Sequence, residues 1–179
     1  MAAHNRSNRV EHIAARQIIR RRDFRLPRRL RMALRFHHLL AVQPKLHTRK
    51  RMDAVVNAPV IRLADTDYAL WYRDIMEDPK KYDGKTVSFR GIVAVDPKFP
   101  PNTFAVGRHV MTCCVEDITY SCVVAEWEKA SVLQTRQWVQ VTGKIHVQKH
   151  KLYRGKGPVL QVQEVVMTSA PEQEVATFY

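Results

Sequence analysis

Two apolar runs joined by a short polar turn decide how this chain folds. The first is Phe104-Ala-Val-Gly-Arg-His-Val-Met-Thr-Cys-Cys-Val-Glu-Asp117, and the second is Tyr-Ser-Cys-Val-Val-Ala at residues 120–125. The acidic pair that ends the first run supplies the turn. Apolar runs of this kind, separated by a tight turn, predict two neighbouring antiparallel strands. This hairpin also carries all three cysteines of the chain, Cys113, Cys114 and Cys122.

Three further stretches have the alternation of a half-buried strand, and with the hairpin they make five short strands. These stretches are residues 86–95, 137–148 and 159–167. Gly91 and Gly143 interrupt two of them, as is typical of the bends and bulges that barrels need. Residues 126–134 have the pattern of a short helix between the third and fourth strands. The expected fold is therefore mainly β, an OB-fold-like five-stranded barrel, with an open antiparallel sheet as the alternative.

A helix is expected before the first of these strands, at residues 65–78. Asp65 or Thr66 is suited to cap its free N–H groups, and apolar residues follow at helical spacing. Pro79 is expected to end it. Residues 53–64 form a linker or a first edge strand, and residues after Pro171 a tail.

The charge is divided sharply along the chain, which suggests two parts. Residues 1–52 hold 15 Lys+Arg against two acidic residues, whereas residues 53–179 hold 15 of each sign. We expect residues 1–52 to be a basic, largely disordered tail and residues 53–179 to be the β-domain. The alternatives for the tail are an anchor to anionic lipid or RNA and a misread start, since Met52 stands where the composition becomes ordinary.

The three cysteines are candidate ligands of zinc or another thiophilic metal. If residues 104–117 are a regular strand, Cys113 and Cys114 point to opposite faces, and only one of them lies across from Cys122. A closed zinc site needs about four ligands and a catalytic one about three, and His109, His146 and His150 are the remaining candidates. Cys113 is about 13 Å along a strand from His109, so these two cannot share a metal. The alternative is three small hydrophobic residues in a barrel core.

Two polar residues in the middle of the first run are candidates for contact with a ligand or a partner. Arg108 and His109 could bind an anion if they face outward, and otherwise they belong to a solvated surface. An OB-type barrel that binds single-stranded nucleic acid is the alternative function, with aromatic residues as the stacking platform. The neutral charge of residues 53–179 counts against it. The basic residues near the last turn count for it: Lys144, Lys149, Lys151, Arg154 and Lys156.

The chain carries no recognisable catalytic motif. No serine stands in a G-x-S-x-G elbow, no glycine-rich phosphate loop is present, and no C-x-x-C or H-E-x-x-H occurs. We therefore expect a protein that is not an enzyme. No run approaches the ~20 apolar residues of a membrane span, which favours a soluble or peripheral protein.

Four segments together resemble the C-terminal domain of the YcgQ-like bacterial family, whose members are described as permease subunits. These are residues 71–91, 96–100, 104–117 and 137–145, and the Met-Thr-Cys-Cys element at 111–114 is the most specific. The resemblance covers residues 61–179. It implies a soluble β-domain that normally follows transmembrane helices, an association with the membrane, and an integral-membrane permease as partner. The sequence departs from the family at its start, where the basic segment replaces the expected helices.

These observations give one expected function. The chain is a non-enzymatic accessory domain that binds a membrane permease, with a soft metal held by Cys113, Cys114 and Cys122. The sequence indicates no established cofactor, and contact with a membrane surface or RNA is open to the basic tail.

Overall fold

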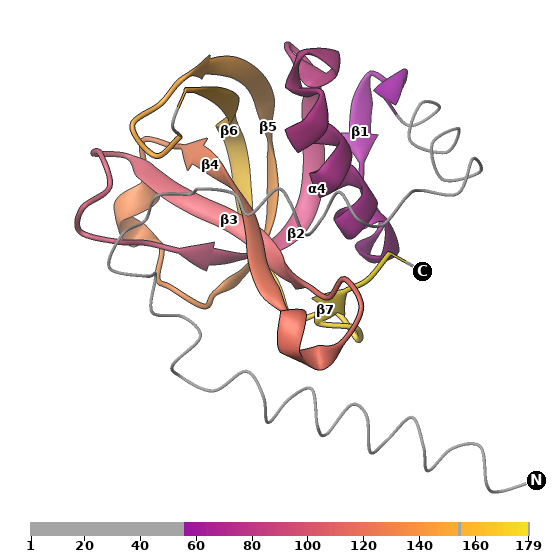
Figure 1. Cartoon of the computed structure of the whole chain (residues 1–179). Helices are drawn as coiled ribbons and strands as arrows, with labels where there is room; N and C mark the ends of the chain where they lie inside the picture. The colour runs from indigo at the N-terminus through magenta and orange to yellow at the C-terminus, as the bar shows by residue number, and fades with distance from the viewer. Residues whose placement is uncertain (1–55, 154, 179) are drawn as a thin grey trace, which may run out of the picture. The chain divides into compact units, whose positions relative to one another are not determined.

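The computed structural model describes residues 56–153 and 155–178 (Figure 1). Within them lie one α-helix, α4, and seven strands, together with four short 3₁₀ helices. The α-helix and the strands are α4 (Tyr68–Glu77), β1 (Val60–Arg62), β2 (Thr86–Ala94), β3 (Thr103–Val110), β4 (Thr119–Glu126), β5 (Trp138–Lys149), β6 (Lys156–Met167) and β7 (Val175–Ala176). The 3₁₀ helices are η1 (Asp65–Asp67), η2 (Pro79–Tyr82), η3 (Val115–Asp117) and η4 (Ala130–Val132). The predicted basic tail, residues 1–52, lies outside the described residues.

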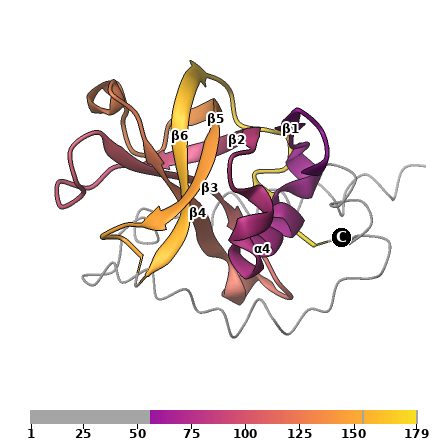
Figure 2. The same cartoon turned by 90° about the horizontal axis from the view of Figure 1, so that it is seen from above.

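The strands form one sheet in the order β1-β2-β5-β6-β4-β3-β7, and β2 also pairs with β3. The five strands from β2 to β6 therefore close into a ring (Figures 1 and 2). All neighbours in the ring are antiparallel except β4 and β6, which are parallel. The mainly β class and the five central strands were therefore predicted correctly. Two short outer strands, β1 and β7, pair in parallel with β2 and β3.

The interior of the ring holds the apolar residues that alternate along the strands. Val87 and Phe89 of β2 and Val139 and Val141 of β5 are buried, as their alternation predicts. Gly143 lies at a register shift between β5 and β6, where the two strands depart from regular pairing. A Cβ at this position would lie 2.5 Å from the Gln161 carbonyl oxygen, so the bulge requires glycine.

The α4 helix lies beside the ring (Figures 1 and 2), and its aromatic residues pack on Phe89 of β2. The Trp71 ring lies 5.0 Å from that of Phe89, and Tyr68 is tilted against both. A 3₁₀ turn, η1, precedes α4, and neither carries the predicted side-chain cap. The helix ends at Glu77, two residues before Pro79, as predicted.

The helix predicted between the third and fourth strands is wrong. The segment between β4 and β5 forms only the three-residue 3₁₀ helix η4. Its hydrogen bonds join residues three apart, from Ala130 N to Trp127 O and from Leu133 N to Ala130 O. The left-handed backbone of Arg136 (φ 79°) then turns the chain into β5. The apolar side of the segment was predicted correctly, because Ala130 and Leu133 are buried.

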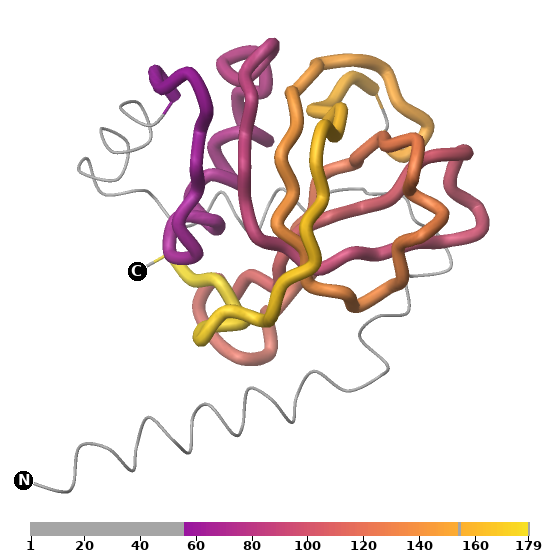
Figure 3. Tube along the Cα trace, turned by 180° about the vertical axis from the view of Figure 1, so that it is seen from behind, coloured from indigo at the N-terminus to yellow at the C-terminus, as the bar shows by residue number. Residues whose placement is uncertain are grey.

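The C-terminal segment is also more ordered than the predicted tail. Val175 and Ala176 form β7 beside His109 and Val110 of β3. In Figures 1 and 3 this yellow segment runs next to the connection between β3 and β4. Residues 173–178 are called the C-terminal strap below.

Candidate metal centre

The connection between β3 and β4 is an irregular loop that carries two of the cysteines. The two strands pair in register up to Val110 and Thr119, so residues 111–118 lie outside the ladder; we call them the thiol loop. The Asp117 carboxylate closes this loop. One of its oxygens accepts the Thr112 N–H at 2.9 Å and the other accepts the Cys113 N–H at 2.8 Å. These two N–H groups would otherwise serve to extend the strand.

The structure corrects the predicted placement of the cysteines. Cys113 and Cys114 do not lie on a strand, and neither is opposite Cys122. Both are exposed in the thiol loop, where the Cys113 and Cys114 sulfurs lie 3.6 Å apart. Cys122 is buried on β4 opposite Gly107.

A third potential ligand stands beside the two thiols. Ligand atoms of Cys113, Cys114 and Asp117 all lie within 4.8 Å of one another. Cys122 is not part of this group. The sequence had indicated Asp117 only as a turn carboxylate. The Cys-Cys-x-x-Asp spacing would have revealed it, because a single 3₁₀ turn, η3, brings the carboxylate back over the thiols.

Asp117 also sets the proton affinity of the thiol next to it. The hydrogen bond from the Cys113 thiol to Asp117, with a smaller contribution from Cys114, raises the pKa of Cys113 to about 12. For Asp117, partial burial acts to raise the pKa, but the hydrogen bonds from Cys113 and from the backbone outweigh it and lower that pKa. A metal ion that binds here must therefore displace a tightly held proton from Cys113.

Cys122 is chemically separate from this pair. Burial raises the pKa of Cys122 to about 12. The residue is only 5% exposed and packs as a small hydrophobic group.

Arg108 and His109 are both buried, so neither forms the outward-facing contact considered from the sequence. Arg108 is 1% exposed, and its guanidinium donates to the Asp65 carbonyl and carboxylate at 2.9 and 3.1 Å. It also donates to the carbonyl oxygens of Gln173 and Glu174. Arg108 therefore ties η1 and the C-terminal strap to the end of β3.

The C-terminal strap also forms a backbone hydrogen bond with the first residue of the thiol loop. The Met111 N–H donates to the Ala176 carbonyl at 3.0 Å. The buried His109 ring packs 5.6 Å from that of Tyr120, the residue directly opposite on β4. Arg108 and the strap thus hold β3 up to the first residue of the thiol loop.

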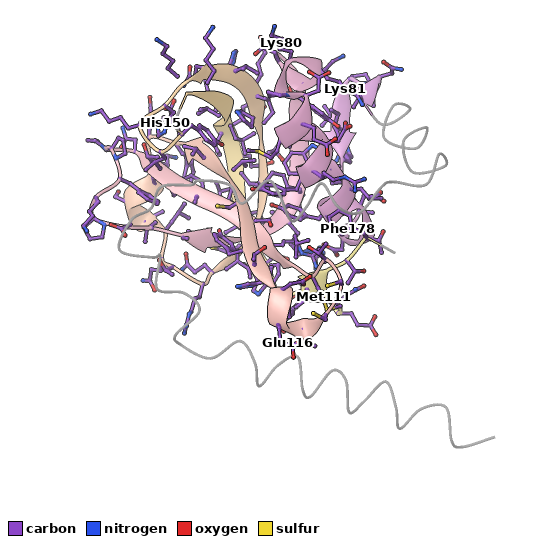
Figure 4. All side chains as sticks on the ribbon, in the orientation of Figure 1. Lys80, Lys81, Met111, Glu116, His150 and Phe178 are labelled. Carbon is purple, nitrogen blue, oxygen red and sulfur yellow. The ribbon has the colours of Figure 1, made fainter. Side chains whose placement is uncertain are left out.

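The remaining histidine candidates lie elsewhere. His146 is on β5 opposite Val159, and His150 follows β5, 3.6 Å from a Glu126 carboxylate oxygen. Figure 4 shows Met111 and Glu116, from the thiol loop, at the end of the molecule away from His150. Neither histidine joins the thiols.

Comparison with known proteins places the chain in a family. The model of the DUF1980 C-terminal domain matches residues 41–176, which includes the ring, the thiol loop and β7. The chain belongs to the DUF1980 C-terminal domain family. The description of this family names no activity, so membership carries no reaction and no partner. No curated protein matches the chain.

One similar solved structure is asparaginyl-tRNA synthetase from Entamoeba histolytica. It shares 16% sequence identity with this DUF1980 domain at a TM-score of 0.31. The match covers 63% of this chain and 24% of the synthetase, so the chain spans about a quarter of that protein. A likeness this weak carries no argument.

Within residues 56–153 and 155–178, no helix combines the length and the apolar character that crossing a membrane requires.

Proposed function

We propose that this DUF1980 domain is a non-enzymatic accessory domain that binds a soft metal ion through Cys113, Cys114 and Asp117. The observation that carries the proposal is the convergence of three ligand atoms within 4.8 Å on an exposed loop. Thiolate and carboxylate groups are both established ligands of zinc. Cys122, which we expected to be a ligand, has no place in this proposal.

The adjacency of the two cysteines supports a role as thiols rather than as a disulfide. Consecutive Cα atoms across a trans peptide are about 3.8 Å apart. Disulfides usually join Cα atoms about 4.4–6.8 Å apart. Closing a bond between Cys113 and Cys114 would therefore strain the loop, and strained disulfides are easily reduced. The pair stays available to a metal.

Zinc titration of the full chain by calorimetry tests this proposal. The chain should bind one zinc ion, and Cys113→Ser with Cys114→Ser should abolish the heat of binding. Cys122→Ala is the matched control, because it removes a thiol of the same chain that lies outside the cluster, and it should bind as the wild type does. Equal binding by the double variant would contradict the proposal.

An integral-membrane permease is the proposed partner of this accessory domain. The support is the resemblance of residues 71–91 and 104–117 to a domain that normally follows transmembrane helices. Affinity purification of the tagged full chain from detergent-solubilised membranes of its host should recover a polytopic permease in stoichiometric amount. Recovery of the chain alone, under conditions that retain other membrane complexes, would count against this partner.

A second candidate function, binding of single-stranded nucleic acid, rests on one specific observation. Lys149 and Lys156 lie directly opposite each other at the end of the β5–β6 hairpin, and both are exposed. Like charges across a strand pair are destabilising unless an anion compensates them. In OB barrels the loop between the fourth and fifth strands contacts oligonucleotides, and the β5–β6 hairpin joins the fourth and fifth strands of this ring.

Oligonucleotide binding by the full chain separates this function from charge attraction by other segments. Lys149→Ala with Lys156→Ala should weaken binding of single-stranded DNA. The slope of the logarithm of the binding constant against the logarithm of the salt concentration should fall by the equivalent of about two phosphate contacts. Lys80→Ala with Lys129→Ala removes the same charge from two other exposed sites and should have a smaller effect. Equal losses in the two double variants would exclude the hairpin as the binding surface.

A further inference from the structure

The spacing of the two sulfurs indicates the geometry of the ion that fits between them. Two thiolates bound to zinc at about 2.3 Å, with a tetrahedral angle between them, stand about 3.8 Å apart. Two sulfurs in linear coordination would stand about 4.6 Å apart at the same bond length. The observed 3.6 Å separation of Cys113 and Cys114 agrees with the tetrahedral arrangement.

The third ligand narrows the class of ion further. Asp117 offers an oxygen, and a mixed set of two thiolates and a carboxylate suits zinc, whereas monovalent copper prefers sulfur ligands alone. The carboxylate is held in place by the N–H groups of Thr112 and Cys113. These two backbone hydrogen bonds orient the Asp117 carboxylate before a metal ion binds.

The loop leaves the fourth tetrahedral position without a ligand from the described residues. No other His, Cys, Asp or Glu of residues 56–153 and 155–178 joins the three within reach of one ion. His109 and Cys122 are the nearest such residues in sequence on the flanking strands, and both are buried. Glu116 is exposed and stands at the edge of the molecule (Figure 4).

The side of the loop that carries the thiols is open to a second molecule. Cys113 and Cys114 are both exposed, and the adjacent apolar side chain of Val115 is 43% exposed. A closed structural zinc site, by contrast, surrounds the ion with four protein ligands.

Building on the proposed metal binding, we infer that the thiol loop is an exchange site for a tetrahedral divalent ion such as zinc. This chain supplies three ligands, and a partner presenting a thiolate or an imidazole supplies the fourth. The ion leaves by associative exchange: the first donor of the partner occupies the open position, and further donors of the partner or water then replace Asp117 and the two sulfurs one at a time. The two thiolates take up two protons from water as the metal departs, and no electron is transferred.

Rapid-mixing kinetics on the zinc-loaded full chain test this inference, with the chromogenic chelator 4-(2-pyridylazo)resorcinol as the incoming ligand. The rate of zinc transfer should increase in proportion to chelator concentration, as associative exchange requires. A rate independent of chelator concentration would show that the ion must first dissociate and would overturn the inference. Absence of bound zinc after equilibrium dialysis would instead refute the proposed function.

Cobalt substitution gives a second readout that does not depend on a variant that folds. The cobalt-loaded chain should show the visible bands of a tetrahedral thiolate site, and added imidazole should shift them by entering the open position. An unchanged spectrum at saturating imidazole would show a closed site and contradict the inference. Glu116→Gln, the exposed neighbour outside the cluster, should reproduce the wild-type shift and transfer rate.

Discussion

Asp117 is the residue on which the candidate site depends. Its carboxylate accepts hydrogen bonds from two backbone N–H groups and from the Cys113 thiol. It therefore both shapes the loop and raises the pKa of Cys113. The sequence was sufficient to single out Cys113 and Cys114, but not to place them. The sequence pattern predicts that the strand continues past Val110. In the structure it stops there, because the Asp117 side chain rather than a partner strand accepts the N–H groups of Thr112 and Cys113. An aspartate that competes with a neighbouring strand for backbone N–H groups acts locally, so it leaves no periodic pattern in the sequence.

Metal binding should strengthen as the pH rises. The pKa of Cys113 is raised to about 12, so this group is protonated throughout neutral pH and must lose its proton to bind zinc. The logarithm of the zinc association constant should therefore increase by at least about one per pH unit between about pH 6 and 8. Calorimetry in buffers of different ionisation enthalpy measures the released protons directly. A pH-independent constant would exclude Cys113 as a ligand.

Asp117→Asn should make Cys113 more reactive and the metal site weaker. The neutral amide removes the charged acceptor that raises the pKa of Cys113, so more thiolate forms at mildly alkaline pH. Alkylation by iodoacetamide, followed by peptide mass spectrometry, should be faster at Cys113, while zinc affinity falls by about tenfold or more. The buried Cys122 provides an internal control and should remain unmodified in the folded protein. Unchanged alkylation of Cys113 would contradict the assigned hydrogen bond.

At the scale of elements, β3 is the strand that organises the site. All its residues are buried, and it pairs with β2, β4 and β7. The sequence predicted its pairing with β4, because a hairpin is a local structure. It did not predict β7, because two residues near the end of the chain carry no pattern, and their partner lies about 65 residues away.

Arg108→Lys should loosen the C-terminal strap and destabilise the fold. Lysine keeps the charge but cannot reach Asp65 and the strap carbonyls together with one planar group. Leaving buried acceptors unsatisfied should lower the free energy of unfolding by about 1–3 kcal/mol, as measured by urea denaturation. Arg90→Lys is the matched control, since Arg90 is half-buried and approaches Asp65 only to 4.0 Å. Equal effects of the two substitutions would refute the role of Arg108 as a tie.

Gly107→Ala should disrupt the pairing of β3 with β4. A Cβ on Gly107 would lie 2.1 Å from the Ser121 carbonyl oxygen and 2.4 Å from the Cα of Cys122, both in the backbone of the next strand. Overpacking against backbone should cost about 3 kcal/mol or more, seen as a lower melting temperature. Gly155→Ala is the control, because a Cβ there meets nothing within 4 Å, and a comparable loss at Gly155 would contradict the steric explanation.

At the scale of the molecule, the closed ring explains why the fold was more predictable than its site. The alternation of buried residues such as Val87, Phe89 and Val141 reflects the ring directly, because each inward position must be apolar. The bend at Gly143 could also be predicted from the sequence, because only glycine fits at this position of the ring. The DUF1980 match covers this ring and the thiol loop together. An exposed loop has no such constraint, so the arrangement of Cys113, Cys114 and Asp117 appeared only in the structure.

The most direct test of the central claim is zinc K-edge X-ray absorption on the full chain loaded with one zinc ion. The bound zinc should have two sulfur ligands at about 2.3 Å, and its remaining ligands should be oxygen or nitrogen at about 2.0–2.2 Å. Cys122→Ala should give the same spectrum, and Cys113→Ser with Cys114→Ser should lose the sulfur shell. A shell with three or more sulfurs, or with none in the wild-type chain, would contradict a site built from Cys113, Cys114 and Asp117.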